Sequence, residues 1–237
     1  MEMKKIWLIF VIVLTVTFGS QAITYALSDV VEIKLRQHTF LIPKHVAMDR
    51  ESVMPDWLLN MSGLDDDSSS TLFRFDDQEV KASVPTYQVA SNNQFADDIE
   101  VLMTALTPEE FNAYIDPNDH TMIRDLWQAK GSYTSRKVEP AEIPGWYKVY
   151  RTVEYPNSWA LLNQYPDSEK QVPETTQDFW VAHCLMLGPK DKRVGSCRTH
   201  VLIGDIVVEF SISDYNLHLL DEIKAFVKSQ VQEWKQS

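Results

Sequence analysis

Both cysteines of the chain lie in one short stretch, residues 183–200 (HCLMLGPKDKRVGSCRTH), between segments whose side chains alternate as in β-strands. Downstream, CRTHVLI and IVVEFSI are separated only by Gly204-Asp205, which is typical of a two-residue hairpin turn. This turn fixes the register of the two strands, so Cys197 opposes Ile212. Folding the preceding strand back through the polar segment in between places Cys184 opposite Cys197. The sequence therefore predicts three adjacent antiparallel strands.

The register assigns the cysteines and histidines of this stretch to different faces. Side chains alternate along a strand, so His183 and Cys184 point to opposite sides, as do Cys197 and His200. One tetrahedral metal ion cannot bind all four side chains, and the spacing is not that of a structural zinc site. Cross-strand cysteines lie within reach of a disulfide, which would stabilise the fold by about 3 kcal/mol. We predict a disulfide, with buried free thiols as the alternative, and a polar surface cluster of His183, His200 and Glu209.

The N-terminus has the pattern of a secretory signal peptide. Lys4 and Lys5 precede an apolar run over residues 6–18, and small residues follow at the spacing of a cleavage site. We predict a signal peptide over residues 1–26. The alternative is an uncleaved N-terminal anchor facing the periplasm, and we expect no other contact with a membrane. Either way the rest of the chain is expected in the periplasm, an oxidising compartment that permits the disulfide.

Residues 27–140 are predicted to form a smaller mixed α/β lobe. VVEIKLRQHTFLIP and TLFRFDD are typical of strands. Apolar residues three or four apart predict a helix over the segment that contains Phe95, Ile99, Leu102 and Leu106. Thr107-Pro108 then marks the start of a second helix, and DHTMIRDLWQAK predicts a third.

Residues 141–237 are predicted to form an antiparallel sheet followed by a helix. Five strand-like segments are separated by turn-rich connections. The last segment, NLHLLDEIKAFVKSQVQEW, carries one apolar stripe that would cover a face of the sheet: Leu217, Leu220, Ile223, Val227, Val231 and Trp234. The predicted fold class is α+β, an antiparallel β-meander with a C-terminal amphipathic helix packed on one face.

The charge of the chain is acidic and uneven. The net charge is −12, and residues 49–124 hold 16 acidic against 4 basic residues. Phosphate backbones are bound by Lys and Arg, so nucleic acid is excluded as a partner. An acidic surface suits a basic protein partner. The predicted partner-binding residues lie in acidic loops: Asp65, Asp66, Asp67, Asp76, Asp77 and Glu79.

Catalytic motifs are missing from the sequence. It contains no GxSxG nucleophile elbow, no HExxH zinc motif, no glycine-rich phosphate loop and no dinucleotide-binding fingerprint. Adjacent acids such as Asp97-Asp98 and Glu109-Glu110 diverge on a helix and make poor acid–base partners. We therefore predict that the protein is not an enzyme and needs no cofactor or metal ion.

Two segments carry a resemblance to a known family: VEIKLRQHTFLIPKHVA near the N-terminus, and residues 184–234, which run from the cysteine hairpin to the last helix. With the export signal, this arrangement resembles the periplasmic immunity proteins of bacterial type VI secretion, notably those that neutralise lipase effectors. The resemblance implies that the protein binds a toxic effector in the periplasm and blocks its active site. It implies no particular contact residues.

Two other functions remain open at this stage. An uncleaved first helix would suit an envelope accessory or assembly protein. An exported hydrolase of unrecognised type could use His183, His200 and Glu209 as acid–base groups. The prediction that the residues favour is an exported protein that binds a basic partner, and the resemblance implies that this partner is an effector enzyme.

Overall fold

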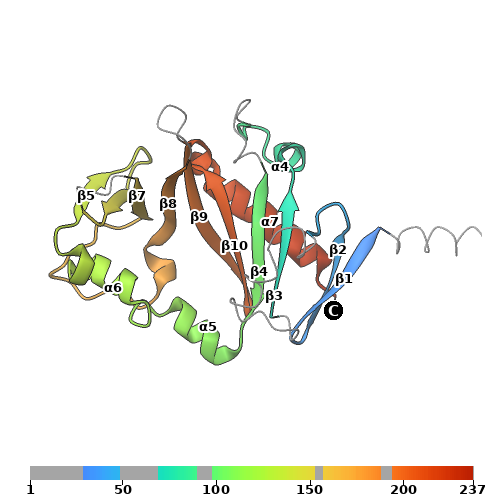
Figure 1. Ribbon diagram of the computed structural model, residues 1–237, viewed down its shortest axis with the longest axis horizontal. Coiled ribbons are helices and arrows are strands. Elements are labelled where there is room, and N and C mark those ends of the chain that lie inside the picture. The colour runs from blue at the N-terminus through green and yellow to red at the C-terminus, as the bar shows by residue number, and fades with distance from the viewer. Residues whose placement is uncertain (1–28, 49–68, 90–97, 153–156, 188–193, 237) are drawn as a thin grey trace, which may run out of the picture.

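The computed structural model describes residues 29–48, 69–89, 98–152, 157–187 and 194–236. Its main feature is an eight-stranded antiparallel sheet with the strand order β3-β4-β10-β9-β8-β7-β6-β5 (Figure 1). A separate two-stranded sheet, β1-β2, lies beside the β3 end. The predicted fold class, α+β with an antiparallel sheet and a C-terminal helix, is confirmed.

The strands of the two sheets have the following bounds: β1 Val30–Leu35, β2 His38–Pro43, β3 Ser70–Phe75, β4 Ile99–Ala105, β5 Lys137–Pro140, β6 Tyr147–Tyr150, β7 Ser158–Leu162, β8 Trp180–Leu187, β9 Val194–Ile203 and β10 Ile206–Ser213. The α-helices are α4 Asp77–Ser83, α5 Pro108–Ile115, α6 Thr121–Gln128 and α7 Leu220–Trp234, and three short 3₁₀ turns are η1 Gly131–Tyr133, η2 Thr176–Asp178 and η3 Asp214–Leu219. The large sheet takes strands from both sides of residue 140, the boundary predicted between the two lobes.

The hairpin of β9 and β10 has the register predicted from its turn. Gly204 has a φ of 64°, which glycine adopts without steric cost. Cys197 pairs with Ile212 across this hairpin and with Cys184 across the β8–β9 pair. The two cysteines form a disulfide with a Cα–Cα distance of 4.0 Å, and both are fully buried. The cross-strand disulfide is thus confirmed.

Helix α7 covers the inner face of the sheet, the face to which the disulfide belongs. Figure 1 shows α7 running across β10, β4 and β3. Every residue of the predicted apolar stripe, from Leu217 to Trp234, is buried. The Trp234 ring contacts Phe73 and Phe75 of β3 at centroid distances of 5.1 and 5.6 Å. Burial of such aromatic rings is a major source of folding free energy.

The helix predicted around Ile99, Leu102 and Leu106 is wrong. Residues Ile99–Ala105 form strand β4, which pairs with β3 on one side and β10 on the other. Its burial alternates with a period of two. The side chains that point into the core are those of Ile99, Val101, Met103 and Ala105. The backbone hydrogen bonds to both neighbouring strands outweigh the helical spacing of the apolar residues. The helix that begins after Thr107 is correct, with Thr107 as a side-chain cap.

The outer face of the sheet carries a second, smaller core. Helix α6, predicted from the sequence, presents Ile123, Leu126 and Trp127 to the end of the sheet formed by β6, β7 and β8. The Trp127 ring meets Phe179 edge to face at 4.9 Å. Helix α6 therefore covers one end of the outer face.

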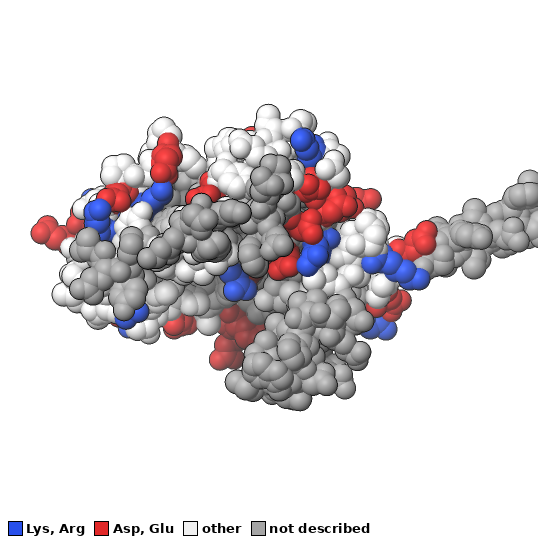
Figure 2. Space-filling view, turned by 45° about the horizontal axis from the view of Figure 1, so that its top comes forward, with Lys and Arg blue, Asp and Glu red and all other residues white. Residues whose placement is uncertain are grey.

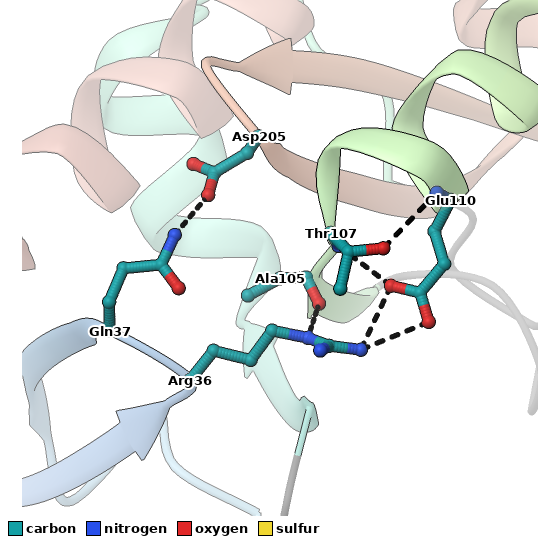
Figure 3. Close-up of polar contacts among 6 residues, drawn as sticks. All are labelled: Arg36, Gln37, Ala105, Thr107, Glu110 and Asp205. Atoms are coloured by element: carbon teal, nitrogen blue, oxygen red, sulfur yellow. Dashed lines mark hydrogen bonds and ion pairs between the residues drawn. The ribbon is translucent and has the colours of Figure 1, made fainter.

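A set of polar contacts fixes the β1–β2 hairpin to the large sheet (Figure 3). Arg36, in the hairpin turn, donates through Nε to the carbonyl of Ala105 at 2.8 Å and through Nη2 to both carboxylate oxygens of Glu110. Gln37 donates to Asp205 in the β9–β10 turn, and His38 Nε2 lies 2.8 Å from the same carboxylate. These contacts join three segments that are far apart in the sequence.

The predicted signal peptide or anchor, residues 1–26, lies outside the described residues. Among the residues that are described, no helix has the length and apolar character needed to cross a membrane. The disulfide is consistent with an exported protein, because disulfides persist in oxidising compartments.

Candidate functional site

The start of α4 presents part of the predicted acidic surface. The Asp76 carboxylate caps the helix by accepting hydrogen bonds from the backbone N–H groups of Gln78 and Glu79, each at 2.9 Å. Glu79 reaches back to the backbone N–H of Asp76, which completes a capping box, and its other oxygen lies 2.8 Å from His45 Nε2. Asp77 occupies the first turn, where a negative charge is favoured by the helix dipole.

Two further carboxylates reach this surface, one from β4 and one from the residue just before it. Arg74 of β3 lies 3.5 Å from the Asp98 carboxylate and 2.9 Å from that of Glu100. The pKa of Asp98 is raised, first by burial and then, against the opposing effect of Arg74, by the charges of Asp77 and Asp76. Asp98 therefore interacts electrostatically with the carboxylates at the start of α4. We call Asp76, Asp77, Glu79, Asp98 and Glu100 the acidic surface, and Figure 2 shows acidic side chains gathered with a few basic ones on that side of the molecule.

The sequence predicted only part of this surface. Asp76, Asp77 and Glu79 lie together on it, whereas Asp65, Asp66 and Asp67 lie outside the described residues. Asp98 and Glu100 were missed because their segment was predicted to be helical. Strand alternation from Ile99 would have placed the Glu100 side chain away from the core.

A pocket of about 180 Å³ opens on the outer face, between the sheet and the α5–α6 segment. We call it the outer pocket. Residues from β8, β9, β10, η2 and the helical segment line it: Tyr114, His120, Ile123, Thr176, Trp180, His183, Arg198, Thr199, His200 and Glu209. The predicted polar cluster of His183, His200 and Glu209 is therefore brought together at one site.

Glu209 is held by two neighbours in the outer pocket. It accepts a hydrogen bond from Arg198 at 2.9 Å and another from the Tyr114 hydroxyl at 3.3 Å. Burial, followed by the charge and hydrogen bond of Glu209, raises the pKa of Tyr114, so this hydroxyl keeps its proton. His120 Nε2 donates to the Tyr114 carbonyl at 2.9 Å and fixes the end of α5 over the pocket.

The two strand histidines of the outer pocket are neutral at pH 7. Burial lowers the pKa of His183, and burial together with the charge of Lys224 lowers that of His200 to about 4. His200 Nε2 accepts a hydrogen bond from the Gln177 amide at 2.7 Å, so the proton of the neutral ring lies on Nδ1. His183 Nε2 lies 3.1 Å from the Ser158 hydroxyl.

The strand histidines of this pocket have neutral hydrogen-bond partners, Ser158 for His183 and Gln177 for His200. Within the described part of the chain, neither His183 nor His200 has a hydrogen bond to a carboxylate that would orient it as a base. The Glu209 carboxylate is paired with Arg198 instead. The described residues also contain no group of three or more His, Cys, Asp or Glu side chains placed to hold a metal ion.

No family model matches the sequence, and a comparison with curated proteins finds no match. The fold is similar to Smlt3025, an immunity protein of the Stenotrophomonas maltophilia type IV secretion system, with a TM-score of 0.47, 9% identity, and coverage of 88% of this chain and 94% of that one. It is also similar to the Neisseria meningitidis iron-regulated outer membrane lipoprotein FrpD, with a TM-score of 0.38, 11% identity, and coverage of 86% and 92%. These values describe a loose likeness of architecture. The assignment to the type VI, lipase-effector kind of immunity protein stays a prediction.

Proposed function

We propose that the protein is an exported binding protein whose acidic surface docks on a basic protein partner. The observation that carries this proposal is the gathering of five carboxylates at the starts of α4 and β4, where Arg74 pairs with Asp98 and Glu100 and His45 pairs with Glu79. Burial is the main cause of the raised pKa of Asp98, and the like charges of Asp77 and Asp76 raise it further in the free protein. A cationic group of a partner would be attracted to these like charges from a distance and would offset their mutual repulsion.

We further propose that the partner is a toxic effector enzyme and that the protein acts as an immunity protein in the periplasm. The N-terminal export pattern, the disulfide and the missing catalytic motifs support this proposal. An inhibitor of this kind needs a complementary surface and no chemistry of its own. The proposal therefore includes that the protein is not an enzyme.

Co-expression with the products of neighbouring genes tests this function. Each candidate effector is exported to the periplasm of a host cell with or without the full chain, and survival is measured. The proposal predicts survival with the full chain and a stable stoichiometric complex on co-purification. A chain that lacks residues 1–26 serves as the control and should not protect, because it stays in the cytoplasm. Protection without complex formation, or no protection by the full chain, would contradict the proposal.

A hydrolase is the second candidate, and one observation favours it. His183, His200 and Glu209 line a common pocket, and the Ser158 hydroxyl lies within hydrogen-bond distance of His183. Turnover assays against lipid and peptidoglycan substrates discriminate between the two candidates. Activity that is lost in His183→Ala would support the hydrolase, whereas the binding proposal predicts no turnover by the native protein.

A further inference from the structure

Arg198 has unused hydrogen-bonding capacity at the outer pocket. Its side chain is 58% exposed, and one nitrogen, Nη2, donates to Glu209. A guanidinium group has five N–H donors in a planar fork that matches a carboxylate. Among the described residues no other partner of this guanidinium is found, so most of its donors remain available to a ligand.

The outer pocket is richer in cationic and imidazole groups than the rest of this acidic protein. Arg198 and the three imidazoles of His120, His183 and His200 line it, against the single carboxylate of Glu209. Because the strand histidines are neutral, they can approach an anion as hydrogen-bond donors at little electrostatic cost. The pocket therefore accepts negative charge more readily than positive charge.

A buried hydroxyl without a partner lies at the same pocket. Thr176 is 3% exposed, and its Oγ1 has no hydrogen-bond partner within the described residues. Buried polar atoms are nearly always paired, because an unpaired one loses its interaction with water without a replacement. Thr176 belongs to η2, which also carries Gln177, the hydrogen-bond partner of His200.

We propose that the outer pocket binds a carboxylate group, with the Arg198 guanidinium as the cationic contact and the Thr176 hydroxyl as a hydrogen-bond donor. The Trp180 and Tyr114 rings would enclose the apolar part of the ligand. The pocket has about six times the volume of a water molecule in the liquid, which suits a small organic acid or the last residue of a peptide. This inference does not depend on the proposed protein partner, because it concerns a different surface.

Binding can be measured by NMR from the indole N–H signal of Trp180 in the full folded protein. The probes are propionate, its neutral analogue propionamide, and the tripeptide Gly-Gly-Ala with a free or an amidated C-terminus. The proposal predicts saturable binding of a carboxylate probe at millimolar concentration and at least about tenfold weaker binding of the matching amide. Propionate binding identifies a free acid as sufficient, whereas binding only of the free tripeptide identifies a chain terminus as the ligand.

Substitutions locate this binding at the proposed residues. We expect Arg198→Gln to weaken carboxylate binding by about tenfold or more, and Thr176→Val, which keeps the shape of the side chain, by about threefold. Arg198→Lys keeps the positive charge beside Glu209 but lacks the planar fork, so it should bind more weakly than the native protein even if Arg198→Gln fails to fold. The matched control is Arg124→Gln on α6, which does not line the pocket and should bind normally.

Three results would overturn the proposal. They are the absence of saturable binding of any carboxylate probe up to about 10 mM, equal binding of acids and amides, and unchanged binding in folded Arg198→Gln or Arg198→Lys. None of these measurements uses a protein partner. A failure here is therefore distinguishable from a failure of the proposed effector binding.

Discussion

At the residue scale, strand alternation separates two kinds of chemistry within β8 and β9. Cys184 and Cys197 face the inner core and close a disulfide, whereas His183, Arg198 and His200 face the outer pocket. This separation is what the sequence predicted from the Gly204-Asp205 turn, and the paired residues confirm it. The disulfide is thus a structural cross-link, and the imidazoles line the outer pocket.

Removing the disulfide should lower stability without changing the fold. The cross-link joins residues 13 apart in the sequence, and a loop of this size is expected to contribute about 3 kcal/mol to the free energy of unfolding. Urea denaturation of the native protein with and without a reductant measures this contribution. The Cys184→Ala, Cys197→Ala double variant is the control, because the reductant should not affect it. A native protein that is equally stable after reduction would show that the disulfide contributes nothing.

Protonation of His200 should make the protein less stable in mild acid. The folded-state pKa is about 4, against about 6.5 in the unfolded chain, so between these values the unfolded chain binds more protons. Stability is therefore lost as the pH falls from 7 to 4, and we expect His200 to account for about 1–3 kcal/mol of that loss.

Urea denaturation at several pH values tests this expectation with His200→Gln, which cannot take up the proton. The variant should lose less stability between pH 7 and pH 4 than the native protein does. His218→Gln serves as the matched control, since it makes the same substitution at an exposed histidine on η3. If His200→Gln and the native protein lose stability in parallel, the buried neutral imidazole is not the cause.

At the scale of elements, the β1–β2 hairpin depends on its turn for attachment to the sheet. Arg36 has a φ of 50°, a left-handed conformation that is unfavourable for a residue with a side chain. Its guanidinium nevertheless contacts Ala105 at the end of β4 and Glu110 in α5 (Figure 3). The contacts of the side chain offset the cost of the backbone conformation.

Two substitutions at Arg36 separate the side-chain contacts from the backbone strain. Arg36→Ala loses the hydrogen bond to Ala105, worth about 1 kcal/mol, while the strained backbone remains. Arg36→Gly loses the same contacts but relieves the strain by about 1 kcal/mol. In chemical denaturation we therefore expect Arg36→Ala to be less stable than both the native protein and Arg36→Gly, by about 1 kcal/mol in each case. An alanine variant as stable as the native protein would show that the side-chain contacts of Arg36 do not stabilise the fold.

Sequence analysis identified the elements whose signal is local and missed those that depend on neighbours. The two-residue turn before Ile206 and the cap at Thr107 are local, and both were correct. Strand β4 was predicted as a helix because its apolar residues fit both periods, and only pairing with β3 and β10 decides between them. The same error concealed Asp98 and Glu100. Tyr114 and His120 could not be placed at the pocket either, because that depends on how α5 docks against the sheet.

At the scale of the whole molecule, the two candidate sites lie on different parts of the large sheet. The acidic surface is built at the β3–β4 edge and α4, whereas the outer pocket lies over β8, β9 and β10. The net charge of −12 would attract a basic partner from a distance, and the acidic surface would determine where it docks. Long-range attraction of this kind is screened by salt, with a Debye length of about 10 Å at 0.1 M.

The central claim is that a basic partner docks on the acidic surface. It is tested most directly with the partner that the co-expression experiment identifies, by measuring its association rate by stopped-flow at low and high salt. Asp77→Lys with Glu100→Lys reverses two charges of the acidic surface and keeps the Asp76 cap. Glu169→Lys with Glu174→Lys makes the same charge change in the exposed β7–β8 connection, at the other end of the sheet. We predict that the first pair slows association about tenfold or more at low salt, with the difference shrinking at high salt, while the second pair has a much smaller effect. Equal rates for the two double variants would contradict docking through the acidic surface.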